Sequence, residues 1–166
     1  MPRRTARPTL PDGLDATDVK ILREVQRNGR AAVTEIAEKA GLSPTPTQRR
    51  LARLEADGYI RAYRARLDRK LLGRGLTVFA YIKVEGHRTE TAVAVQRFLD
   101  ARPEIVRCAV VSGEYDLLAE IAVADIEAFE RLLFDNLFKL PLVRDVRSHF
   151  VIREMKDGEE LDMSGL

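Results

Sequence analysis

The chain has 166 residues, of which 45% are hydrophobic and 33% charged, and its formal net charge is +2. This length allows one domain or two small ones, and the apolar content excludes a disordered chain. No apolar run reaches the roughly 18 residues that a membrane span needs, and one cysteine excludes an intramolecular disulfide. The basic N-terminus is not followed by an apolar segment, so we expect no signal peptide and a cytoplasmic protein.

The charge is distributed unevenly along the chain. Residues 1–74 carry 17 basic and 9 acidic side chains, a net of +8, whereas residues 75–166 carry 11 and 17, a net of −6. Such a division is typical of a chain in which one half binds a polyanion. Two ordinary domains with different surface charge would explain it equally well.

The first half predicts helices. Residues 1–13 contain three prolines and three arginines without an apolar period, which indicates a flexible basic arm. A helical pattern then begins at Leu14, with Asp15 or Thr17 as its N-cap, and ends at Asn28.

Two shorter helices follow. The first is predicted over Val33–Ala40 and is stopped by Gly41. The second begins after Ser43, whose hydroxyl is expected to accept a hydrogen bond from an amide of the first turn. Proline at positions 44 and 46 is tolerated there, because first-turn amides have no partner within the helix. Asp57-Gly58 closes this helix, and the alternation over 60–67 predicts a strand or wing.

The second half predicts the order strand, helix, strand, strand, helix, strand, which is the ferredoxin-like arrangement. A hairpin turn at Gly113-Glu114 joins the two middle strands, and residues 157–166 are expected to form a loose tail. The predicted elements are Leu76–Glu85, Thr89–Ala101, Ile105–Ser112, Tyr115–Val123, Ile126–Leu140 and Val143–Met155.

The helices at 33–57 suggest a helix-turn-helix. In that motif the second helix enters the major groove of DNA, and its first residues contact base edges. Gln pairs with adenine, Arg with guanine, and a Thr methyl contacts thymine. The base-contacting residues predicted on this ground are Ser43, Thr45, Thr47, Gln48 and Arg49. Arg50 and Arg53 are expected to hold phosphates. The alternative is a plain three-helix domain with a solvated polar face, and the basic half of the chain favours DNA.

Several motifs in a fixed order carry a family resemblance. They are Leu14-Asp15-x-x-Asp18-x-x-Ile21-Leu22, Gly41-Leu42-Ser43-Pro44-Thr45-Pro46, Arg50-Leu51-x-Arg53-Leu54-Glu55-x-x-Gly58-x-Ile60, Leu72-Gly73, Pro103-Glu104-Ile105-Val106-x-Cys108, Gly113-Glu114-Tyr115-Asp116 and Leu140-Pro141-x-Val143. With this order and spacing, residues 14–156 resemble the leucine-responsive/asparagine (Lrp/AsnC) family of prokaryotic transcription regulators.

The resemblance implies an α+β chain that senses an amino acid. It implies a winged helix-turn-helix domain over 14–60, a linking strand or hinge over 61–75 and a ferredoxin-like amino-acid-binding domain over 76–156. It further implies double-stranded DNA as a partner, dimers built through the regulatory sheets, and tetramers or octamers. Arg50 matches a family position that is nearly always basic and supports the domain, so we rank it below Thr47, Gln48 and Arg49 for base recognition.

The same resemblance implies an effector site on the loop formed by Gly113, Glu114, Tyr115 and Asp116. Loop amides can bind a carboxylate, and Asp116 can bind an α-ammonium group. Glu114 stands where the family more often has aspartate. A Thr-x-Thr pattern of the family falls on Val146-Arg147-Ser148, so the effector contacts are expected to differ, with Ser148 and the adjacent His149 near the pocket. Without the resemblance, the loop would be interpreted as a plain β-turn.

The sequence offers no catalytic or metal-binding set. Cys108 is expected to be a small buried side chain, and His87 and His149 are expected at the surface or an interface. Glu120 lies either on a solvated face or in the effector pocket. We therefore predict a regulator without cofactor other than an amino-acid effector, not an enzyme. The alternative is a metabolite-sensing assembly protein whose helical domain binds protein rather than DNA.

Overall fold

The computed structural model describes residues 13–86, 89–156, 158 and 160–163. The chain divides into two compact units, one formed by residues 1–66 with 157–166 and the other by residues 67–156. The predicted basic arm, except for Gly13, and His87 lie outside the described residues. No helix in the described part is long and apolar enough to cross a membrane.

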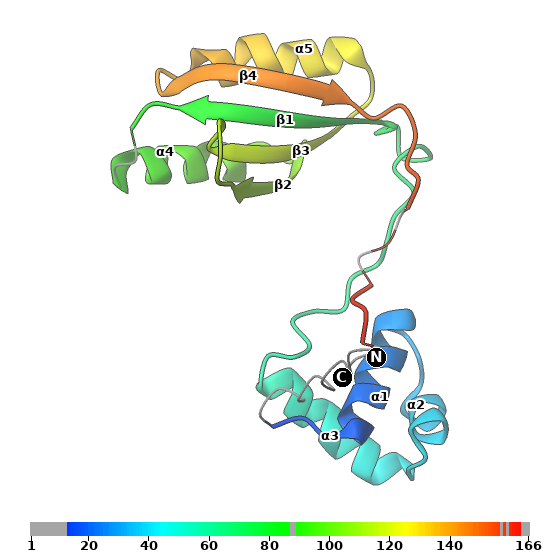
Figure 1. The fold of residues 1–166 in the computed structure, drawn as a ribbon. Helices are drawn as coiled ribbons and strands as arrows, with labels where there is room; N and C mark the ends of the chain where they lie inside the picture. Colours follow the sequence, from blue (N-terminus) through cyan, green and yellow to red (C-terminus); the bar gives the residue numbers. More distant parts are fainter. Residues whose placement is uncertain (1–12, 87–88, 157, 159, 164–166) are drawn as a thin grey trace, which may run out of the picture. The chain divides into compact units, whose positions relative to one another are not determined.

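The first unit contains three helices, α1 (Ala16–Arg27), α2 (Val33–Ala40) and α3 (Pro44–Ala56) (Figure 1). Each helix buries one apolar face, and together they form a small core. Its fully buried members are Ile21, Val25, Ile36, Ala40, Leu51 and Leu54. The helix-turn-helix is therefore present where the sequence predicts it, with Gly41 ending α2 at a φ of 73°.

The two expected N-caps behave differently. Asp15 caps α1 and accepts from the amides of Thr17 and Asp18, each at 2.8 Å. Ser43 occupies the N-cap position of α3, but its side chain makes no capping hydrogen bond, so that prediction is wrong. Pro46, at the third helical position, has no N–H, which removes one of the two amides to which an N-cap hydroxyl can bond.

The strand or wing predicted over 60–67 is not formed within this chain. Residues 61–68 have no regular secondary structure and are exposed, and a turn follows over 69–73. Alternation alone does not make a strand, because a strand also needs a neighbour for its backbone groups. The described part of the chain offers none to this segment.

The second unit is built on one antiparallel sheet with the strand order β2-β3-β1-β4. Its strands are β1 (Leu76–Val84), β2 (Ile105–Val110), β3 (Leu117–Val123) and β4 (Val143–Phe150), and its helices are α4 (Thr89–Asp100) and α5 (Ile126–Asp135) (Figure 1). This order of elements and strands confirms the ferredoxin-like arrangement and the α+β class.

β4 and α5 end five residues earlier than predicted, whereas the bounds of the other four elements differ from the prediction by at most two residues. β4 ends at Phe150 rather than Met155: its last pair with β1 is Phe150 with Val78, and beyond it the Val151 amide donates to the Thr77 carbonyl at 2.9 Å. α5 ends at Asp135, and a short 3₁₀ helix, Leu137–Lys139, replaces its predicted last turn.

The sheet has one helix-covered face and one exposed face. Alternate residues of β1 and β3, among them Val78, Ala80 and Ile121, are buried against the helices. The intervening residues of β1, such as Phe79 and Lys83, are exposed. We call this second surface the exposed face.

The C-terminal segment also differs from expectation. The sequence predicts a loose tail over 157–166, whereas the backbones of Leu161 and Met163 are hydrogen-bonded to side chains of α1.

Candidate DNA interface and effector site

The first turns of α3 present polar side chains to solvent. Ser43, Thr45, Gln48 and Arg49 are all exposed there. Within the described part of the chain, neither Gln48 nor Arg49 makes a side-chain hydrogen bond or an ion pair. Their donors and acceptors are therefore available to a ligand, and both residue types form two-pronged hydrogen bonds with base edges.

Thr47 does not share this exposure. Its side chain is fully buried, and its hydroxyl donates to the Ser43 carbonyl at 3.0 Å. A buried side chain cannot contact a base, so the expected base contact by Thr47 is replaced by a structural role. Its spacing with Leu51 and Leu54, i, i+4 and i+7, places it on the inner face of α3 and could have indicated this.

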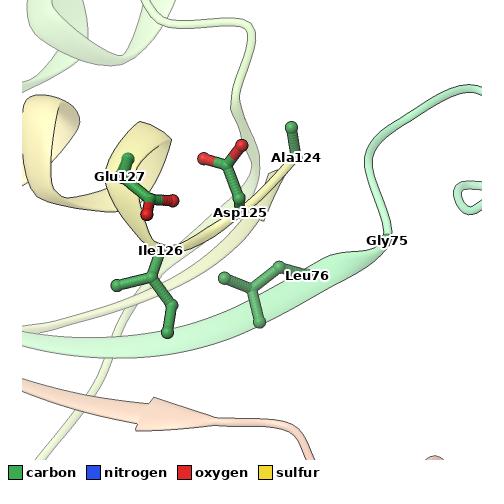
Figure 2. Close-up of a pocket in the computed structure, with 6 residues that line it drawn as sticks. All are labelled: Gly75, Leu76, Ala124, Asp125, Ile126 and Glu127. Carbon is green, nitrogen blue, oxygen red and sulfur yellow. The ribbon is translucent and has the colours of Figure 1, made fainter.

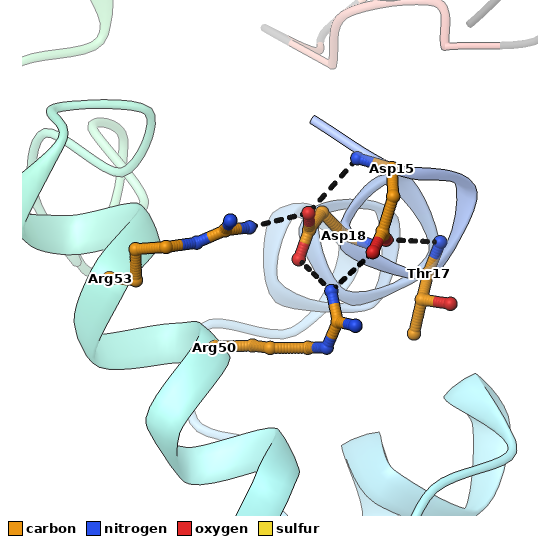
Figure 3. A network of polar contacts seen from close by, with 5 residues as sticks. All are labelled: Asp15, Thr17, Asp18, Arg50 and Arg53. Carbon is orange, nitrogen blue, oxygen red and sulfur yellow. Dashed lines mark hydrogen bonds and ion pairs between the residues drawn. The ribbon is translucent and has the colours of Figure 1, made fainter. Parts of the chain in front are cut away.

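Arg50 and Arg53, in contrast, are already paired (Figure 3). One guanidinium nitrogen of Arg50 donates to Asp15 at 2.6 Å and to Asp18 at 2.8 Å, and Arg53 donates to Asp18 at 2.5 Å. Asp18 is completely buried and also accepts the Asp15 amide at 3.0 Å. The network joins the start of α1 to α3. Phosphate binding by the two arginines stays a prediction.

The electrostatics of this network stabilise the charged forms. Burial acts to raise the pKa of Asp18, but hydrogen bonds from the Asp15 amide, Arg50 and Arg53 outweigh it and hold that pKa below its ordinary value. The Asp18 amide, followed by Arg50, lowers the pKa of Asp15. The hydrogen bonds that Arg50 makes with Asp18 and Asp15 raise the pKa of Arg50. Both carboxylates therefore remain ionised at neutral pH.

Hydrogen bonds between Asp116 and the backbone of β1 hold the predicted effector loop in place. The Asp116 amide donates to the Ile82 carbonyl at 3.1 Å, and a carboxylate oxygen of Asp116 accepts the Val84 amide at 2.8 Å. Gly113 has a φ of 131°, a conformation that favours glycine. One oxygen of Asp116 thus already accepts a hydrogen bond from β1.

Tyr115 anchors the loop to the exposed face of the sheet. Its ring is buried at 5.9 Å from the ring of Tyr81, and its hydroxyl donates to Asp145 at 2.8 Å, a bond that raises the pKa of Tyr115. The guanidinium of Arg147 lies over the same ring at 5.2 Å and is 3.9 Å from Glu114.

His149 joins this group, but Ser148 does not. His149 contacts the ring of Tyr81 edge-on at 5.5 Å. Ser148 pairs with Ala80, whose side chain is buried on the helix-covered face. We define the exposed-face cluster as the residues that gather beside the loop, which are Tyr81, Glu114, Tyr115, Asp145, Arg147 and His149. The sequence prediction missed Tyr81 and Asp145, although their positions follow from the two-residue period of β1 and β4.

Glu120 is not a free pocket acid. It accepts a hydrogen bond from Arg69 at 2.8 Å, and Arg69 also contacts the Thr77 hydroxyl at 3.4 Å. Cys108 lies half-buried against the core on the helix-covered face, and burial raises the pKa of its thiol. No group of three or more His, Cys, Asp or Glu residues among the described positions could hold a metal ion.

A hollow of about 400 Å³ lies at the start of β1 and the start of α5 (Figure 2). It is lined by Gly75, Leu76, Ala124, Asp125, Ile126 and Glu127. Asp125 accepts the Ala128 amide at 2.7 Å and thereby caps α5. None of the predicted effector residues lines this hollow.

Comparison with known proteins identifies both units. Residues 14–61 match the family model of a winged helix-turn-helix DNA-binding domain, and residues 77–161 match that of the Lrp/AsnC ligand-binding domain. The leucine-responsive regulatory protein of Haemophilus influenzae is 40% identical over 143 residues, which are 86% of each chain.

Solved structures agree over nearly the whole length. A transcriptional regulator of Neisseria meningitidis in complex with L-methionine superposes with a TM-score of 0.87 at 33% identity, covering 91% of this chain and 97% of that one. The feast or famine regulatory protein of Mycobacterium tuberculosis, also complexed with L-methionine, gives 0.78 at 30% identity, covering 89% and 98%. These relatives are regulators, not enzymes. The chain belongs to the Lrp/AsnC family of transcription regulators.

Proposed function

We propose that this protein recognises specific DNA through the start of α3 and adjusts that binding to an amino acid. The observation that carries the DNA part is the contrast between neighbouring residues. Gln48 and Arg49 are exposed and make no side-chain hydrogen bond or ion pair with the described residues, whereas Arg50 is hydrogen-bonded to Asp15 and Asp18. Ser43 and Thr45 flank them on the exposed side of the helix. Protein binding by the helical unit is less well supported, because residues 14–61 match a DNA-binding domain.

The effector is proposed to bind beside the loop at residues 113–116. An α-amino acid carries a carboxylate and an ammonium group, and Arg147 and Glu114 present the complementary charges on an exposed surface. The partly exposed ring of Tyr81 and the exposed ring of His149 offer a wall for the effector's side chain. The L-methionine complexes of two relatives support an amino acid as the ligand class.

Self-association is the third part of the proposal. The exposed face carries Phe79, and the segments next to the sheet carry exposed Leu71 and Ile152. Apolar side chains that lie exposed together on one surface mark a site of protein association. We propose dimers through the regulatory sheets and assembly to tetramers or octamers. The protein would act in the cytoplasm, beside the DNA that it binds.

One experiment tests the DNA and effector parts together. Binding is measured to the DNA upstream of the protein's own gene and to an unrelated fragment of equal length, across a salt series and with pools of amino acids. Preference for the upstream fragment that one pool alters is the expected result. Equal binding to both fragments at every salt concentration would contradict control of its own gene.

A matched pair of variants tests the effector site. Arg147→Ala should abolish the response to the active pool, whereas Arg144→Ala, on the same strand but paired with Glu85, should retain it. Loss of the response in both variants would point to a general effect on β4 and would contradict the assignment to Arg147.

A further inference from the structure

The C-terminal segment is held against α1 through its backbone. The side-chain amide of Gln26 donates to the Leu161 carbonyl at 2.9 Å, and its oxygen accepts the Leu161 amide at 3.0 Å. Arg23 donates to the Met163 carbonyl at 2.8 Å. Gln26 thus bonds both the N–H and the carbonyl group of Leu161, as a neighbouring β-strand would.

These contacts occupy a distinct side of α1. Val19, Arg23 and Gln26 are spaced i, i+4 and i+7 and therefore share one face of the helix. Glu24 instead turns to α2, where it pairs with Lys39 at 2.8 Å. The acidic residues Glu160 and Asp162 of this segment are exposed.

The docked segment changes the charge of the DNA-binding unit. Residues 1–66 carry 14 basic and 8 acidic side chains, a net of +6. Residues 157–166 carry four acidic side chains and no basic one, a net of −4. Together the unit has a net charge of only +2. Binding to DNA without regard to sequence depends chiefly on positive charge, whereas discrimination between sequences depends on base contacts.

We propose that residues 160–163 form an acidic strap on α1 that weakens binding of the unit to DNA of any sequence. The strap suppresses the charge-driven part of binding and leaves the base-contacting side chains of α3 in place. This proposal rests on DNA binding by the N-terminal unit and adds a regulatory element to it.

Docking is tested in the full chain by hydrogen exchange. Gln26→Ala removes both hydrogen bonds between Gln26 and the Leu161 backbone without changing the net charge. The matched control is Gln96→Ala on α4, where the side chain donates to Asp100 at 2.8 Å. The Leu161 amide should exchange faster in Gln26→Ala and at the wild-type rate in Gln96→Ala. Unchanged exchange in Gln26→Ala would overturn the strap.

The effect on DNA is measured with a duplex of random sequence. Gln26→Ala should bind about threefold to tenfold tighter than wild type at ~50 mM salt, and the gain should shrink at ~200 mM, where exposed charges are screened. No gain, or an equal gain at both salt concentrations, would overturn the electrostatic role.

A third variant separates charge from docking. Glu159→Gln combined with Glu160→Gln lowers the negative charge of the segment and leaves its backbone contacts available. It should bind random DNA more tightly while Leu161 exchanges as in wild type. Failure of the DNA-binding proposal would be recognised separately, because no variant would then bind DNA although hydrogen exchange still reports the strap.

Discussion

Arg50 of α3 lies 2.8 Å from Asp18 of α1, although the two residues are 32 positions apart in the chain. The carboxylate that Arg50 meets is completely buried and also accepts hydrogen bonds from Arg53 and from the Asp15 amide. This contact holds α3 to the first helix of the unit. It also explains why adjacent arginines, Arg49 and Arg50, are expected to differ in role.

Replacing the buried carboxylate should destabilise the DNA-binding unit. Asp18→Asn keeps the shape of the side chain but leaves the guanidinium groups of Arg50 and Arg53 without their buried counter-charge. We expect a loss of about 1–3 kcal/mol, because both arginines remain partly exposed and can be solvated. Urea unfolding of the full chain measures it, with Asp57→Asn, at an exposed position of the same unit, as the control. Equal stability of both variants would contradict the role of Asp18.

The same network predicts a dependence on pH. The pKa values of Asp15 and Asp18 are lower in the folded chain than their ordinary value of 3.8. Their contribution to stability is therefore complete above about pH 5 and is lost as the pH falls through the ordinary value and then the lowered values. The urea midpoint of the unit should stay constant between pH 7 and pH 5 and then fall, more weakly in Asp18→Asn than in wild type. Parallel decline in both proteins would contradict the assignment.

Arg49 and Arg50 should separate specificity from stability. Arg49→Ala should reduce discrimination between a specific site and random DNA by about 1–3 kcal/mol, the value of a good base contact, without changing the unfolding midpoint. Arg50→Ala should lower the midpoint, because Asp18 loses a partner. Binding titrations and urea unfolding of both variants test this. An unaltered preference for the specific site in Arg49→Ala would exclude Arg49 as a base-contacting residue.

Cys108 should react slowly with thiol reagents. It is the single cysteine of the chain, it packs against the core of the sheet, and burial raises the pKa of its thiol. Both effects lower the amount of accessible thiolate, which is the reactive form. We expect labelling at pH 7.5 to be at least about tenfold slower than in urea-unfolded protein. Equal rates would contradict the burial.

Much of the fold could be predicted because it depends on local patterns. The bounds of α2 follow from the apolar period and Gly41, and the order of the second half follows from the change between helical and two-residue periods. The shortened β4 could not be predicted, because its end depends on how far it pairs with β1, a strand that begins more than 60 residues earlier in the chain. Likewise, the alternation over 60–67 does not reveal whether a partner strand is present.

The candidate site was predicted less completely. Exposure of Gln48 and Arg49 agrees with the expected role, yet Thr47 is buried, and the pairs of Arg50 and Arg53 join residues more than 30 positions apart. The opposite orientations of Ser148 and His149 follow from strand geometry that the sequence prediction did not apply. The strap was missed because Gln26 recognises backbone atoms, which leave no pattern in the side chains.

The segment that precedes the sheet should be protected from proteolysis by its contact with the sheet. Arg69 is bound to Glu120 at 2.8 Å and contacts Thr77, so the turn over 69–73 is attached to the exposed face. Glu120→Gln keeps the shape but removes the ion pair, which for partly exposed partners contributes about 0.2–1 kcal/mol. Opening of the turn, and therefore tryptic cleavage after Lys70, should become at most about fivefold faster. Mass spectrometry of the first cleavage products measures this site against cleavage after Arg61, which lies outside the attached turn. Glu130→Gln on α5 is the control, and an equal increase in both variants would show that the attachment of Arg69 does not protect the turn.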